Sequence, residues 1–225
     1  MTDLWTTLLP LMIGSAVLPI QLAITVLLLQ AEGGRRTAAA WVGGMTVVRL
    51  LQGVVFGLVI GIGVAGEETS GPSLIVSTLL LVVAIGFYIT AAKKLVAGPD
   101  EDAPPPRWMS MVESIDPTRA FLLGAAWVGI SPKLWAFTLA GIAAVAYAEL
   151  GAASAIVTFL VFVVGAQAIH LGLLALTIVV PDRSVALLAR ASGGLERHGP
   201  TIMIALSLVF GTFFLVKALA GLGVL

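Results

Sequence analysis

The side chains that could do chemistry in this chain are polar residues placed inside long apolar runs. They are Gln21, Arg49, Gln52, Lys133, Gln167 and His170. A cation in the middle of a membrane is costly, so it normally faces a cavity and marks a functional site. Binding of an anionic headgroup or a carboxylate substrate is therefore the chemistry that Arg49 and Lys133 predict, with a water-filled cavity as the alternative.

No carboxylate lies in the same apolar runs as these two cations. All twelve acidic residues fall in connections or at the ends of runs, so Arg49 and Lys133 have no ion-pair partner there. The pattern argues against a cation site built on carboxylates and against a carboxylate proton relay. If a proton is moved, His170 is the histidine that could carry it, because His198 lies in a basic connection.

Two prolines occur in matching sequence frames. Pro19 and Pro132 each begin the pattern Pro-x3-Ala-x-Thr, and Lys133 directly follows the second proline. A proline removes a backbone donor and clashes with the preceding helical turn. Both prolines are therefore predicted to break their helices and to border one shared site. A weaker similarity relates residues 44–49 to residues 165–170.

Each of these residues also has a purely structural interpretation. Arg49 and Lys133 could bond only to backbone carbonyls and water, or Lys133 could stay neutral. His170, Gln21 and Gln167 could hold helices together through hydrogen bonds. The prolines could kink their helices and do nothing more.

Catalytic and metal sites find little support in the sequence. It has no His-x-x-x-His or Glu/His cluster, no phosphate-binding loop and no Gly-x-Ser-x-Gly turn. Ser131 and Lys133 are two residues apart and do not face each other on a helix, which disfavours a Ser–Lys dyad. We therefore expect no enzyme activity, no catalytic residue, no bound metal and no cofactor.

The elements that must position the polar residues are membrane helices. Of 225 residues, 59% are hydrophobic and 11% are charged, whereas a soluble domain carries about 25% charged residues. Six runs are long enough to cross a bilayer: 4–29, 38–64, 73–96, 119–147, 152–180 and 201–222.

The absence of cysteine excludes disulfides and thiolate chemistry, and a net charge of zero gives no nucleic-acid signature. The N-terminus has no basic n-region, so we expect the first helix to be retained.

Basic residues in the connections set the predicted orientation. Three connections and their helix ends hold Arg35, Arg36, Lys93, Lys94, Arg107, Arg119, Arg183, Arg190 and Arg197. The N-terminus and the other two connections hold none. By the positive-inside rule, the three basic connections face the cytoplasm and both termini face outside.

The chain is expected to divide into two halves with a linker between them. Residues 1–96 and 119–225 hold three spans each, and residues 97–118 form a proline-rich cytoplasmic linker that we expect to be extended and mobile. Because three is odd, the second half enters the membrane from the opposite side. The two halves would then be inverted repeats with a site at their midplane interface. A short surface helix is expected at 182–190.

Four features resemble the lysine exporter (LysE) superfamily: six spans, the sequence at 33–43, Gly86-Phe-Tyr, and Ser131-Pro-Lys133. That group often has Asn-Pro-Lys and Pro-Gly-Pro where this chain has Ser131-Pro-Lys133 and Leu18-Pro-Ile20, which speaks against amino-acid export. The Leu-Pro-Ile form, the linker and the short connections look most like the sulfolipid- and glycopeptidolipid-addressing branch of actinobacteria. The resemblance implies movement of an amphipathic glycolipid to the cell surface, beside a larger lipid exporter. By motif, it singles out Pro19, Pro132 and Lys133.

The combined expectation is an all-α integral protein of the bacterial inner membrane that assists export of an amphipathic (glyco)lipid. Its substrate site is predicted to comprise Pro19, Gln21, Arg49, Gln52, Pro132, Lys133, Gln167 and His170. Two alternatives stay open: export of a small amino acid or anion, and a scaffold that transports nothing and binds a larger lipid exporter. Expected partners are a membrane lipid or glycolipid, that exporter, and a second copy of the chain in a homodimer, with no nucleic acid.

Overall fold

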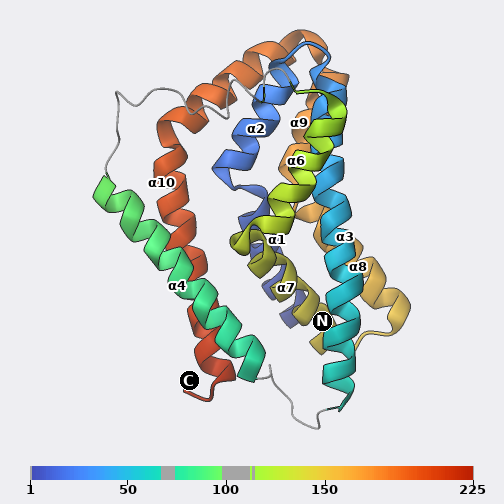
Figure 1. The fold of residues 1–225 in the computed structure, drawn as a ribbon, viewed down its shortest axis with the longest axis vertical. Helices are drawn as coiled ribbons and strands as arrows, with labels where there is room; N and C mark the ends of the chain where they lie inside the picture. Colours follow the sequence, from blue (N-terminus) through green and yellow to red (C-terminus); the bar gives the residue numbers. More distant parts are fainter. Residues whose placement is uncertain (1, 67–73, 98–111, 113–114, 225) are drawn as a thin grey trace.

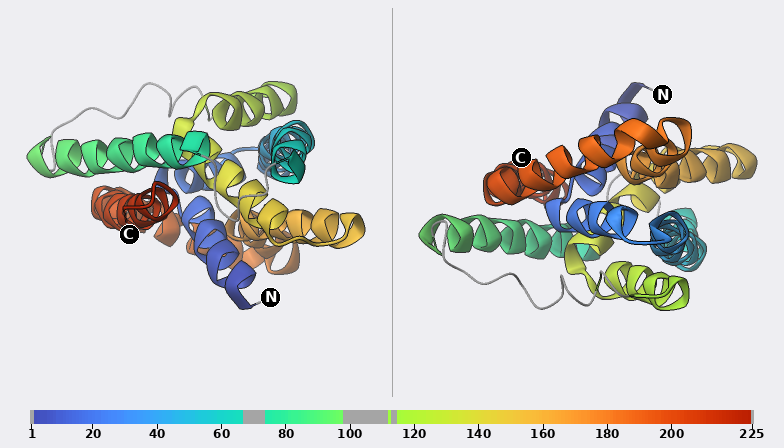
Figure 2. Two further views of the ribbon diagram at one scale, coloured as in Figure 1. Left: turned by 90° about the horizontal axis from the view of Figure 1, so that it is seen from below. Right: turned by 90° about the horizontal axis from the view of Figure 1, so that it is seen from above.

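The structure, a computed structural model, describes residues 2–66, 74–97, 112 and 115–224, and every element in this part of the chain is an α-helix (Figures 1 and 2). The helices in chain order are α1 (Thr2–Ala16), α2 (Pro19–Gln30), α3 (Gly34–Gly66), α4 (Leu74–Ala97), α6 (Pro117–Ile130), α7 (Pro132–Tyr147), α8 (Ala152–Gly165), α9 (Ala168–Val179) and α10 (Pro181–Gly221). The predicted all-helical class is confirmed. Most of the predicted linker, residues 98–111 and 113–114, lies outside the described residues.

Both prolines break their helices, as the sequence predicts. Pro19 is the first residue of α2 and Pro132 the first residue of α7, where a missing backbone N–H costs nothing. The preceding residues, Leu18 and Ser131, are extended, with ψ of 114° and 111°, because a following proline disfavours helical backbone. The chain bends by 53° between α1 and α2 and by 73° between α6 and α7.

A third break was not predicted. The run at 152–180 was expected to be one span, but α8 and α9 are separate helices that meet at 63°. No proline lies at this break, unlike the other two. Gly165, the last residue of α8, lies so close to the Met12 side chain on α1 that a Cβ there would clash with it, and Gln167 has left helical geometry at φ −119°.

Two described helices, α3 and α10, are long and apolar enough to cross a membrane, and up to five crossings result if each bent pair counts as one. The six predicted spans, and their arrangement as inverted repeats, stay a prediction. The surface helix expected at 182–190 is not separate: α10 runs from Pro181 to Gly221 without ending near Gly193 and Gly194. A glycine destabilises a helix by only about 1 kcal/mol, which is too little to end α10. Helix α10 also contains Pro200, and it bends visibly along its length (Figure 1).

The helices pack around two apolar cores. Figure 2 shows α4 beside the second part of α10 on one side and α3 beside α6 on the other, with α1 and α7 between them. One core joins α2, α3 and α6 around Trp41, with Leu188 of α10. The other joins α1, α4, α7, α8 and α10 through phenylalanines; for example, the Phe137 ring lies 4.8 Å from the Phe210 ring. Helix α7 therefore stands between two packing layers.

Glycines allow α3 and α6 to cross at close range. A Cβ on Gly124 would meet the backbone oxygen of Trp41, and backbone cannot move aside as a side chain can. We expect Gly124→Ala to lower the stability of the protein by about 1–3 kcal/mol, measured as a drop in Tm in detergent. Gly129→Ala is the control on the same helix, because nothing lies within 4 Å of a Cβ there. Equal Tm values for the two variants would contradict this close packing.

Candidate functional site

Several buried polar side chains lie on helix α3 or bond to it, and α3 contacts all three broken helix pairs. Trp41, Thr46 and Arg49 on α3 each form a hydrogen bond to a residue on a broken helix pair. Eight residues separate Trp41 from Arg49, which corresponds to about 12 Å along the helix. The polar groups therefore form a column inside the protein rather than a single point.

Arg49 is fully buried, and hydroxyl groups surround its guanidinium. Its Nη2 donates to Ser15 Oγ at 2.7 Å, in the last turn of α1, and its Nη1 donates to Thr138 Oγ1 at 3.4 Å, on α7. Its Nε has no hydrogen-bond partner among the described residues. The single ion pair of the described chain joins Arg119 to Asp116 at 3.2 Å on the surface. The charge of Arg49 is therefore solvated by dipoles but not neutralised by a carboxylate.

The hydroxyl of Thr138 is oriented by its own helix. It donates to Leu134 O at 3.0 Å, one turn earlier, and this common bond of threonine in helices leaves the oxygen lone pairs free to accept. Arg49 uses one of them. The position of Thr138, six residues after Pro132, is thus set by where α7 begins.

A second cluster surrounds Thr25 on α2. Its Oγ1 lies 2.9 Å from Gln21 O, 3.1 Å from Trp41 Nε1 and 3.0 Å from His170 Nδ1 on α9. His170 is fully buried, and its Nε2 has no partner among the described residues. The predicted residues Gln21 and His170 are thus brought to the same helix interface.

Gln167 forms a third polar contact, between the α8–α9 break and α3. It is located at the break between α8 and α9, and its Nε2 donates to Thr46 Oγ1 at 2.6 Å. Its Oε1 has no partner in the described part of the chain. Gln52, one turn beyond Arg49 on α3, is also buried, and neither its Oε1 nor its Nε2 has a partner among the described residues.

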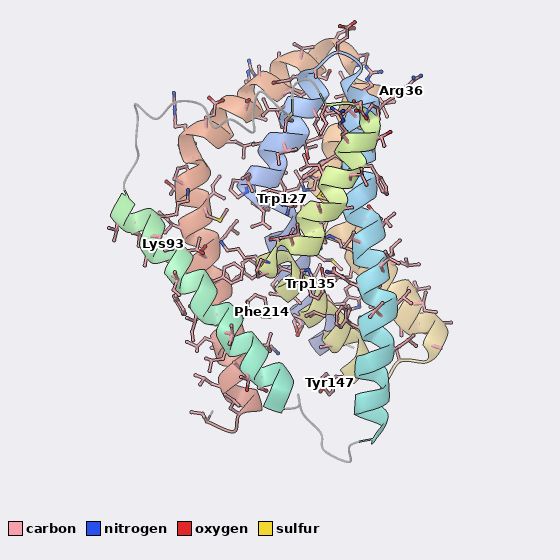
Figure 3. All side chains as sticks on the ribbon, in the orientation of Figure 1. Arg36, Lys93, Trp127, Trp135, Tyr147 and Phe214 are labelled. Atoms are coloured by element: carbon pink, nitrogen blue, oxygen red, sulfur yellow. The ribbon has the colours of Figure 1, made fainter. Side chains whose placement is uncertain are left out.

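Lys133 does not join Arg49. It is partly exposed in the first turn of α7, and its Nζ lies 5.5 Å from the centre of the Phe87 ring on α4. Phe137, one turn later on α7, packs against Phe87 of α4 and Phe214 of α10. Figure 3 labels Phe214 in this layer. Thr138 faces the other way, toward Arg49. Helix α7 therefore separates the two predicted headgroup cations.

The prolines differ in their surroundings. Pro19 is buried, whereas Pro132 is exposed. Trp127 and Trp135 lie on either side of the α6–α7 break (Figure 3), and Trp135 Nε1 donates to Gly129 O at 2.9 Å across it. The break is thus held by side chains as well as by the proline ring.

Two cavities of about 400 and 420 Å³ lie away from this column. Leu29 and Arg35 line both of them, at the end of α2 and the beginning of α3. None of the predicted site residues lines either cavity.

Sequence reasoning missed the hydroxyl partners of Arg49 and His170. Thr25 and Thr138 were visible as the last residues of the two Pro-x3-Ala-x-Thr frames, but no role was assigned to them. Ser15, Trp41 and Thr46 carry no signal of their own, because isolated small polar residues and tryptophan are ordinary in membrane helices. Their role depends on which helix lies opposite.

Comparisons with known proteins place the chain in a family. No curated protein and no solved structure matches it. The family model described as "Sap, sulfolipid-1-addressing protein" matches residues 8–220, nearly the whole length. The chain therefore belongs to the sulfolipid-1-addressing protein family.

Proposed function

We propose that this protein acts in the bacterial inner membrane and assists export of an amphipathic lipid or glycolipid to the cell surface. The observation that carries the proposal is Arg49, a fully buried cation with no carboxylate partner among the described residues. The family description names a sulfolipid, which is by its name an anionic lipid. An anionic headgroup is thus the cargo that both findings support.

The energetics favour an anion at Arg49. Removing a charge from water is costly, and the hydroxyls of Ser15 and Thr138 return only part of the lost solvation. A guanidinium has five N–H donors, so donors remain for a sulfate, phosphate or carboxylate. Charge-assisted bonds to such a group are about twice as strong as neutral ones. The acyl chains of the lipid would stay between helices, in the bilayer.

The proposal includes two inverted three-helix repeats. Arg49 lies five residues after Gly44 and contacts Thr138, and His170 lies five residues after Gly165 and contacts Thr25. Each basic residue thus meets the threonine of the proline frame in the other half. A two-fold relation requires this reciprocity.

The contact between Thr46 and Gln167 adds further support. Thr46 lies two positions after Gly44, and Gln167 lies two positions after Gly165. Equivalent residues of the two halves thus touch each other, as residues on a two-fold axis do. In inverted-repeat transporters the substrate site lies at such an interface. We therefore place the headgroup site beside this pair of residues.

Three finer features belong to the same proposal. The chain would be a divergent member of the lysine exporter superfamily, with both termini outside and no catalytic step. The bends before Pro19 and Pro132 would let α2 and α7 move relative to α1 and α6. Lys133 would receive the headgroup on the α4–α10 side of α7, before or after Arg49. A larger lipid exporter and a second copy of the chain are proposed partners.

Native mass spectrometry with lipid identification tests the proposal. We expect wild-type protein to retain an anionic lipid that Arg49→Met and Lys133→Ala each lose by about tenfold or more, since one lost charged contact is worth at least that factor. Lys217→Ala is the matched control, because Lys217 is an exposed lysine of α10. If all four proteins retain the same bulk lipids, Arg49 and Lys133 are structural residues. A scaffold or an exporter of small solutes then becomes the better explanation.

A further inference from the structure

A second group of buried polar atoms lies on α2 and on the α9 residue that contacts it. Gln21 is 1% exposed, and neither its Oε1 nor its Nε2 has a partner among the described residues. Gln21 lies one turn before Thr25, so both residues occupy the same face of α2, the face that His170 contacts. The unpartnered His170 Nε2 belongs to the same interface. Burial without hydrogen bonds is costly, so these atoms are suited to an external partner.

The contacts of Thr25 determine which hydrogen-bonding role His170 Nε2 has. The backbone oxygen of Gln21 can only accept and Trp41 Nε1 can only donate. A hydroxyl has one hydrogen and two lone pairs. The Thr25 hydroxyl must therefore donate its hydrogen to Gln21 O and accept from Trp41 Nε1. The third contact is a hydrogen bond only if His170 Nδ1–H donates to the remaining lone pair of Thr25 Oγ1. The neutral ring then presents Nε2 as a bare acceptor.

A bare ring nitrogen and a carboxamide together select the ligand. A sulfate or phosphodiester anion has no hydrogen for Nε2, and an ammonium group has no lone pair for the carboxamide N–H. A hydroxyl group both donates and accepts. We propose that Gln21 and His170 bind a hydroxyl group of a sugar or polyol headgroup, as an uncharged counterpart of the Arg49 site. This inference rests on the proposed function and specifies its cargo.

The distance along α3 between the two polar clusters suits a ligand that carries both a hydroxyl group and an anion. Trp41, which bonds to Thr25, and Arg49 are about 12 Å apart along α3, and the Thr46–Gln167 pair lies between them. A headgroup that carries both an anion and hydroxyl groups would therefore contact both sites.

Native mass spectrometry with three lipids that share one diacylglycerol separates the two sites. The probes are glucosyl diacylglycerol with hydroxyls alone, phosphatidic acid with an anion alone, and phosphatidylglycerol with glycerol hydroxyls and an anion. For Gln21→Leu we expect a loss of about tenfold or more in affinity for glucosyl diacylglycerol and unchanged phosphatidic acid binding. His170→Phe should behave likewise, and Arg49→Met should show the opposite pattern. Gln30→Leu, at the exposed end of α2, is the control. If Gln21→Leu weakens phosphatidylglycerol but not glucosyl diacylglycerol, the ligand is a glycerol rather than a sugar.

The decisive variant is Gln21→Leu, because its carboxamide forms no hydrogen bond with the described chain whose loss could unfold the protein. Leucine removes two buried polar groups, so we expect the Tm without lipid to rise by about 2 °C or more. A lower Tm would make Gln21 a structural residue and overturn the inference. Unchanged binding of both hydroxylated lipids, or loss of all three lipids, would overturn it as well. Unchanged phosphatidic acid binding by Arg49→Met would instead refute the proposed function and leave the hydroxyl test intact.

Discussion

Replacing Lys133 with glutamate is expected to abolish lipid translocation while the helical fold persists. Lys133 is partly exposed, its Nζ faces the Phe87 ring at 5.5 Å, and no described carboxylate pairs with it. A carboxylate would lose the cation–π contact and repel an anionic headgroup. It would not unfold α7, because acidic residues are favourable in the first turn of a helix.

The measurement is the transfer of fluorescent phosphatidylglycerol between leaflets of proteoliposomes, with a loss of about tenfold or more expected, together with circular dichroism and Tm. Lys93→Glu makes the same charge change at an exposed site on α4 and should retain the wild-type rate. An unchanged rate for Lys133→Glu would favour the scaffold. A lower Tm with lost helicity would give Lys133 a structural role.

Replacing Pro132 with alanine is expected to straighten the 73° bend between α6 and α7. Alanine restores the backbone donor, frees Ser131 to become helical, and favours a helix interior by about 3 kcal/mol over proline. A straighter α7 would carry Thr138 away from Arg49, whose bond to it is already long at 3.4 Å. Translocation and anionic lipid binding should fall together.

Electron paramagnetic resonance can measure the bend directly. The chain has no cysteine, so spin labels attach only at introduced positions, such as Thr118 at the beginning of α6 and Glu149 just beyond α7. The distance between the labels should increase in Pro132→Ala. Pro10→Ala is the control, because Pro10 already lies inside α1 without breaking it. An unchanged distance would mean that tertiary contacts hold the bend.

The apolar composition and the spacing of polar residues determined a large part of this protein. They predicted an all-helical chain, and the breaks at Pro19 and Pro132 follow from the proline ring itself, which acts on its immediate neighbours. Burial of Gln21, Arg49 and His170 was also predictable, because each lies deep inside an apolar run. These are local properties, and a sequence records them directly.

Tertiary structure alone decided how the polar residues are grouped. The sequence placed Arg49 and Lys133 in one site, but α7 separates them. Lys133 and Thr138, which binds Arg49, are five residues apart on α7 and therefore point to different sides of it. The break after Gly165 arises where Met12 of another helix packs against it, and the continuity of α10 overrides two glycines. The contacts of Arg49 with Ser15 and Thr138 join segments far apart in the chain. Which hydroxyl lies opposite a buried cation depends on how helices cross, and that is fixed only when they pack.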